Sequence, residues 1–130
     1  MAGREVFNKD GFKNVEKDGE IIGYEFQFKA QYDRGFTPSI LRDIKVNVDG
    51  IEAKREDIRF TVNDETFTLE QTRTLVDSDY RWEFGDYATI TVLQPGGLKP
   101  GKHHMDAFQR IAPSDMPFEI EAACETDFEI

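Results

Sequence analysis

Hydrophobic and polar residues alternate along several short segments of the chain. In residues 24–32, aromatic residues and an alanine occupy every second position, and Glu, Gln or Lys occupy the positions between them. A period of two is the signature of a half-buried strand. Other segments repeat this alternation or are rich in residues that favour strands. The predicted strands are residues 24–32, 44–48, 58–62, 66–69, 81–84, 87–93 and 118–128.

Turn signals separate these segments. Asp49-Gly50 lies between two alternating segments and predicts a tight hairpin, because both residues tolerate a positive φ. Residues 17–20 predict another turn, and the Gly- and Pro-rich residues 94–101 predict a loop. Residues 39–42 are predicted to form no more than one helical turn. Residues 70–79 are predicted to form a loop or a short strand. Residues 103–111 are predicted to be extended, although their alternation is poor.

These elements predict an all-β fold. No segment sustains the 3.6-residue period of an amphipathic helix. Short strands with turn signals every 8–12 residues are typical of an antiparallel β-sandwich or a jelly roll. A length of 130 residues fits one domain with its own core. We therefore expect a single β-sandwich domain over residues 1–130, with minimal helix.

The last predicted strand has one apolar and one acidic face. We expect the apolar row to face the core and the acidic row to face solvent, where acids favour solubility and protect a sheet edge. A catalytic carboxylate pair is not assigned, because 26 acidic residues make close pairs frequent by chance. The apolar row is Phe118, Ile120, Ala122, Cys124, Thr126 and Phe128, and the acidic row is Glu119, Glu121, Glu125, Asp127 and Glu129.

Charge and composition narrow the classes of partner. Sixteen Lys and Arg residues against 26 Asp and Glu residues give a net charge of −10. This acidity argues against nucleic acid and anionic membranes, which carry charge of the same sign. The sequence lacks an apolar run of signal-peptide or membrane-helix length. Cys124 is the single cysteine, and we interpret it as a structural thiol. We expect a cytoplasmic protein.

His103 and His104 are the two histidines of the chain. Neighbouring residues of a strand point to opposite faces, so the two rings are poorly placed to share a metal ion. One of them has the chemistry to bind a metal beside Asp106 and Asp115. The alternative is that both are solvated residues at the edge of a loop. We assign no catalytic residue and no metal ligand in this chain.

Aromatic and arginine residues gather in two places. Residues 79–84 contain Arg81 and Trp82, and residue types of this kind are enriched at interfaces. The alternation there also agrees with Trp82 in the core, and exposed aromatic rings can stack on sugars. Residues 32–36 contain Tyr32, Arg34 and Phe36 beside a glycine, in a predicted loop.

The order of several segments resembles the small β subunit of bacterial C-glycoside deglycosidases. The likeness covers roughly residues 20–104 and depends on the ordered set rather than on any one motif. The segments read YDRGF at 32–36, SILRDI at 39–44, VDG at 48–50, DIRF at 57–60, RWEFG at 81–85 and PGGLKPGKH at 95–103.

The resemblance implies a heteromeric lyase. Enzymes of this family cleave the C–C bond between a 3-keto sugar and an aromatic aglycone of the flavonoid type. Their catalytic α subunit resembles a xylose-isomerase-like barrel and carries a divalent metal such as Mn²⁺ and a histidine base. No cofactor is therefore expected in this chain, which would support the α subunit in a hetero-oligomer.

Two functional hypotheses follow from the sequence. In the first, the chain is the non-catalytic β subunit. In the second, it is a stand-alone, lectin-like carbohydrate-binding sandwich; a stand-alone hydrolase is a distant third. For the first hypothesis we place the subunit interface at Tyr32, Arg34, Phe36, Arg81 and Trp82.

Overall fold

The computed structural model describes residues 7–8, 11–29, 41–62, 65–72, 87–112 and 117–130. Nine strands, one short α-helix and a 3₁₀ turn between β4 and β5 lie in these residues. The strands are β1 (Lys13–Lys17), β2 (Glu20–Lys29), β3 (Leu41–Val48), β4 (Ile51–Glu52), β5 (Ile58–Val62), β6 (Glu65–Thr68), β7 (Tyr87–Leu93), β8 (Lys102–Ile111) and β9 (Ile120–Glu129); the 3₁₀ turn is η3 (Arg55–Asp57) and the helix is α1 (Leu69–Thr72).

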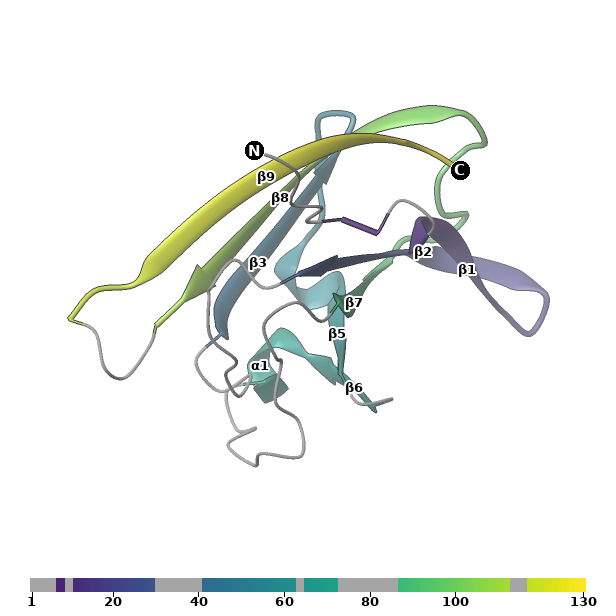
Figure 1. The fold of residues 1–130 in the computed structure, drawn as a ribbon. Helices are drawn as coiled ribbons and strands as arrows, with labels where there is room; N and C mark the ends of the chain where they lie inside the picture. Colours follow the sequence, from purple (N-terminus) through teal and green to yellow (C-terminus); the bar gives the residue numbers. More distant parts are fainter. Residues whose placement is uncertain (1–6, 9–10, 30–40, 63–64, 73–86, 113–116) are drawn as a thin grey trace.

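The strands form two antiparallel sheets. One sheet has the order β1-β2-β7-β5-β6, and the other has the order β4-β3-β8-β9. Figure 1 shows β3, β8 and β9 side by side along one side of the molecule and the other sheet facing them. The prediction of an all-β, antiparallel sandwich with minimal helix is confirmed.

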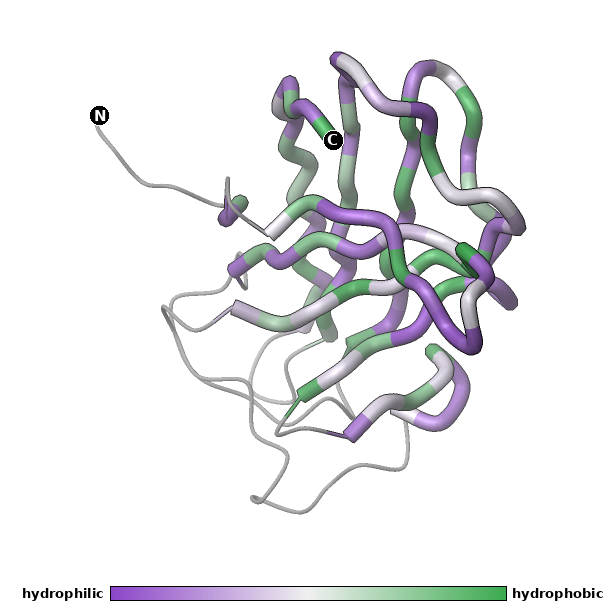
Figure 2. Tube along the Cα trace, turned by 90° about the vertical axis from the view of Figure 1, so that its right-hand side faces the viewer, coloured by the Kyte–Doolittle hydropathy of each residue, from purple (hydrophilic) through white to green (hydrophobic). Residues whose placement is uncertain are grey.

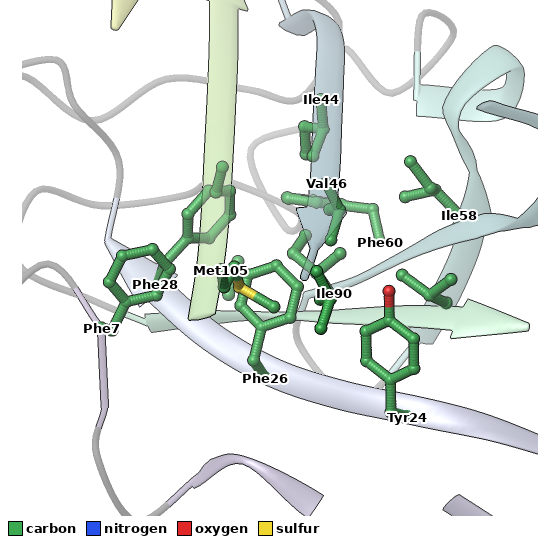
Figure 3. Packing of buried hydrophobic residues seen from close by; sticks show 14 of the residues in the cluster. Phe7, Tyr24, Phe26, Phe28, Ile44, Val46, Ile58, Phe60, Ile90 and Met105 are labelled. Carbon is green, nitrogen blue, oxygen red and sulfur yellow. The ribbon is translucent and has the colours of Figure 1, made fainter. Parts of the chain in front are cut away.

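The core lies between the sheets and is rich in aromatic rings. Phe26 and Phe28 of β2 are fully buried, and so is Met105 of β8 (Figure 3). The ring of Phe12 stacks on Phe26 and on Phe128 of the opposite sheet, with centroids 6.0 and 4.2 Å apart. Burying one such side chain stabilises the fold by about 1.5–3 kcal/mol. The aromatic contacts therefore link the two sheets.

The predicted alternation agrees with the burial of most strands. Figure 2 shows hydrophobic and hydrophilic positions alternating along the strands. On β3 the three β-branched residues Ile44, Val46 and Val48 are buried. The strands predicted at residues 58–62 and 87–93 are β5 and β7 with the same bounds. The predicted strand at residues 81–84, and Ala30 and Tyr32 of the first strand, lie outside the described residues.

The predicted turns have the expected backbone. Asp49 and Gly50 connect β3 to β4 with φ values of 54° and 87°. Asp18 and Gly19 connect β1 to β2 with φ values of 53° and 82°. Two consecutive positive φ values match the right-handed twist of hairpin strands, so the predicted hairpin at Asp49-Gly50 and the predicted turn at residues 17–20 are confirmed.

Two local predictions are wrong. Leu41 and Arg42, predicted in a helical turn, begin β3, where Leu41 pairs with Ile111 and is 1% exposed. Residues 70–72, predicted as loop or strand, belong to α1. The Thr68 hydroxyl accepts a hydrogen bond from the Gln71 N–H at 3.1 Å, and the Gln71 side chain accepts one from the Thr68 N–H at 2.9 Å. This capping box starts the short helix.

The prediction for Phe118 is also wrong. Its side chain is 58% exposed, and β9 begins two residues later at Ile120. Phe128, at the other end of the same row, is 7% exposed. The row therefore leaves the core toward the start of β9.

None of the helices in the described residues has the length and apolar character needed to cross a membrane.

Gly23 should tolerate no side chain. It is buried on β2, and a Cβ atom there would lie 2.0 Å from the Val92 carbonyl oxygen of β7. Because that oxygen belongs to the backbone, the two strands must move apart. We expect Gly23→Ala to lower the free energy of unfolding by about 1–3 kcal/mol. Urea unfolding measures the change, with Glu20→Ala, at an exposed position of the same strand, as the control. Equal stability of the two variants would contradict this close approach.

Candidate functional site

The two histidines lie at the start of β8, next to the end of β9. In the β8–β9 register His103 is opposite Phe128, and His104 is opposite Asp127. An open hollow of about 620 Å³ covers this end of the two strands. It is lined by Asp49, Lys102, His103, His104, Asp127, Phe128 and Glu129.

His103 points toward the core and has a partner on each ring nitrogen. Its Nδ1 lies 2.6 Å from the Asp49 carboxylate, and its Nε2 lies 2.6 Å from the backbone carbonyl oxygen of Lys99. The ring also stacks on Phe128, with centroids 5.4 Å apart. Only 11% of the side chain is exposed. The ring therefore joins the β3–β4 turn, the loop before β8 and the end of β9.

Both partners of His103 are hydrogen-bond acceptors. A neutral imidazole has one N–H and can donate to only one of them, whereas an imidazolium donates to both. The geometry thus favours the protonated ring. The hydrogen bond with Asp49 raises the pKa of His103, and the carbonyl of Lys99 raises it further. The same hydrogen bond, together with the one that Asp49 accepts from the His104 N–H, lowers the pKa of Asp49.

His104 points to the opposite face and lies among carboxylates. Its Nδ1 is 2.6 Å from Asp127, and its Nε2 is 3.6 Å from Asp106 and 3.8 Å from Glu125. Asp106 and Glu125 are directly opposite each other on β8 and β9. Like charges in that position repel, and a proton on His104 reduces the repulsion. The hydrogen bond with Asp127 raises the pKa of His104, and the charges of Asp106, Asp127 and Glu125 add to the effect.

The outer cluster offers the donor atoms of a cation site. One ligand atom from each of His104, Asp106 and Glu125 lies within 4.8 Å of the others. One nitrogen and two carboxylate oxygens suit a divalent cation. The three side chains are 44%, 56% and 70% exposed, so water surrounds the group. The charges of this group favour the protonated form of His104.

The sequence predictions for this region are partly confirmed. The histidines do point to opposite faces, and Asp106 lies beside one of them. Asp115, the other acid considered, lies outside the described residues. The alternative that both histidines are solvated is wrong for His103, which is largely buried. Asp49, Glu125 and Asp127 were missed as partners because their contacts depend on strand register, which the local pattern does not specify.

The five residues predicted at a subunit interface cannot be placed from this structure. Tyr32, Arg34, Phe36, Arg81 and Trp82 all lie outside the described residues. Their role at an interface stays a prediction.

The His103 contacts should make stability depend on pH. Because its pKa is higher in the folded chain than the ordinary value of 6.5, the contribution is complete below pH 6.5 and is lost as pH rises through the folded pKa. Between pH 6 and pH 9, we expect the melting temperature of the wild-type chain to fall by about 2–4 °C more than that of His103→Gln. Calorimetry measures this difference, and His104→Gln serves as the comparison, because its more exposed ring should contribute a smaller change of the same sign. An identical pH dependence in wild type and His103→Gln would contradict the assignment.

Comparison with known proteins identifies the family. The family model described as "C-glycoside deglycosidase beta subunit" matches residues 2–114. A protein of Eubacterium cellulosolvens named C-glycoside deglycosidase beta subunit is 32% identical over 127 residues, which cover 97% of this chain and 85% of the relative. The residues matched by the family model include the positions of both histidines, Asp49 and Asp106. This chain therefore belongs to the C-glycoside deglycosidase β-subunit family.

Proposed function

We propose that this chain is the non-catalytic β subunit of a heteromeric C-glycoside deglycosidase. The complex would cleave the C–C bond between a 3-keto sugar and an aromatic, flavonoid-type aglycone, as a carbon–carbon lyase of flavonoid glycoside catabolism. Membership of a β-subunit family implies a partner subunit. We assign catalysis to that partner and a supporting role to this chain, in the cytoplasm.

The proposed reaction needs a base and a group that polarises a carbonyl. The ketone at C3 of the sugar acidifies the proton on C2, and a base removes this proton. The electron pair forms a double bond between C1 and C2, the bond from C1 to the aglycone breaks, and the aglycone carbon takes up a proton. A divalent metal ion that polarises the ketone lowers the barrier to the first step.

The hydrogen-bond acceptors around the two histidines are the observation that supports a non-catalytic role. Both ring nitrogens of His103 already face acceptors within the fold. His104 lies among three carboxylates, which favour its protonated form. A protonated imidazole cannot act as a general base. The chain, which has only these two histidines, is thus poorly equipped to provide an imidazole base.

We place the missing groups on the α subunit. We expect it to have a xylose-isomerase-like barrel that holds Mn²⁺ or a similar divalent metal and the histidine base. The C-glycoside substrate would bind at that site. Tyr32, Arg34, Phe36, Arg81 and Trp82 remain our proposed contacts with it.

The lectin-like alternative receives less support. That hypothesis depends on exposed aromatic rings that stack on sugars. Most aromatic residues of the described segments, such as Phe12, Phe26 and Phe60, are instead buried in the core. Tyr87 and Phe118 are the large exposed aromatic side chains among the described residues.

Co-expression with the α subunit tests the proposal. We expect the two chains to elute as one complex and to release the aglycone from a 3-keto C-glycoside. Release by the α subunit alone should be about 100-fold slower, because a small misplacement of catalytic groups has an effect of this size. Chromatography and an aglycone assay measure both outcomes.

Two results would contradict the proposed function. One is separate elution of the two chains with full activity of the α subunit alone. The other is turnover by this chain in the absence of any partner. Titration of the isolated chain with plant C-glycosides tests the lectin-like alternative, which requires binding without the α subunit.

A further inference from the structure

The edges of the two sheets are not alike. In the described residues, the outermost strands are β1 and β6 in one sheet and β4 and β9 in the other. β6 has four residues and β4 has two, while β1 has five and a register shift between Val15 and Glu16. β9 has ten residues and pairs with β8 without a register shift. Short or bulged strands discourage pairing with another chain, and the acids of β9 discourage pairing with a strand of like charge. β9 is therefore the edge best suited to receive a strand of opposite charge.

The charges along β9 argue against a second copy of this chain as the strand that pairs there. Every outward position of β9 except Ala123 is acidic, and these acids are exposed. Figure 1 shows β9 along the outer side of its sheet. Two β9 strands paired with each other would bring rows of carboxylates together, and like charges at cross-strand positions repel. The acidic row consists of Glu121, Glu125, Asp127 and Glu129.

The cations of the neighbouring strand do not balance the carboxylates of this row. At its ends, Lys102 and Arg110 of β8 lie opposite Glu129 and Glu121. Between them, His104 lies opposite Asp127 and Asp106 lies opposite Glu125, so the four acids of β9 and Asp106 face at most three cations of β8. The chain as a whole carries a net charge of −10. A partner segment with Lys or Arg side chains is therefore complementary to this edge.

An exposed apolar side chain lies at the start of the same edge. Phe118 is 58% exposed, two residues before β9 begins, and Ile120 is only partly buried. A large exposed aromatic ring beside a row of charges is the kind of anchor that interfaces bury. The edge thus joins an apolar anchor to a charged strip.

We propose that the outer edge of β9, together with Phe118, is a docking surface for a basic segment of the catalytic subunit. The segment pairs with or lies along β9, its cations face the acidic row, and its apolar residues cover Phe118. This inference rests on the proposed function, because it takes the catalytic subunit as the partner. It adds a second contact region to the five residues expected from the sequence.

Charge reversal with a matched control tests the docking surface. The test variant is Glu121→Lys/Glu125→Lys on β9. The control is Glu52→Lys/Glu56→Lys, which makes the same change in net charge at exposed positions on β4, the opposite edge of the sheet, and on η3. The affinity of each purified chain for the α subunit is measured by calorimetry at low and high salt. Circular dichroism and melting temperature verify that both variants fold.

We expect the β9 variant to bind at least about tenfold more weakly than wild type, and the control to bind like wild type. High salt should weaken wild-type binding and reduce the difference between the chains. Phe118→Ala should also weaken binding, whereas Ile51→Ala, at a 70% exposed position on β4, should not.

Three results would overturn the inference. If wild type binds the α subunit and the β9 variant binds equally well, the docking surface is wrong and the proposed function stands. If wild type shows no binding, the proposed function fails and the inference fails with it. If wild type forms a dimer in sedimentation experiments and the β9 reversal alone dissolves it, the occupant is a second copy.

Discussion

The packing of aromatic side chains between the two sheets is the interaction on which the rest of the structure depends. Phe26 and Phe28 come from one sheet, Met105 and Phe128 come from the other, and Phe12 stacks between them. This contact decides which face of each strand is buried. Because side chains alternate strictly along a strand, one buried residue determines the direction of all its neighbours on that strand.

The different roles of the two histidines follow from this constraint. Met105 is buried, so His103, two residues earlier, points inward, and His104 points outward. His103 meets Phe128, a carbonyl and one carboxylate, and becomes part of the link between the sheets. His104 meets three carboxylates at the surface. Two adjacent and chemically identical side chains thus contact different parts of the molecule, and in each case the neighbouring acceptors favour the protonated form.

The sequence predicts the fold well where one short pattern carries the information. Asp49-Gly50 predicts a turn because its backbone requirement is local. β8 is harder to predict because its inward row contains His103 and Gln109, which are polar, so the alternation is obscured. Gln109 is nevertheless fully buried and donates a hydrogen bond to the Lys29 carbonyl of the opposite sheet. Its burial is explained by a partner 80 residues away in the chain, which no local pattern contains.

The candidate site was less predictable than the fold for the same reason. That His103 and His104 diverge follows from strand geometry alone, but Asp49 and Glu125 reach them only through the β3–β8 and β8–β9 registers. Those registers also place Asp106 against Glu125, an arrangement that is unfavourable unless a positive charge lies nearby. A protonated His104 provides one such charge within the chain. A surface that retains more carboxylates than its own cations can neutralise repels copies of itself and is complementary to a basic partner.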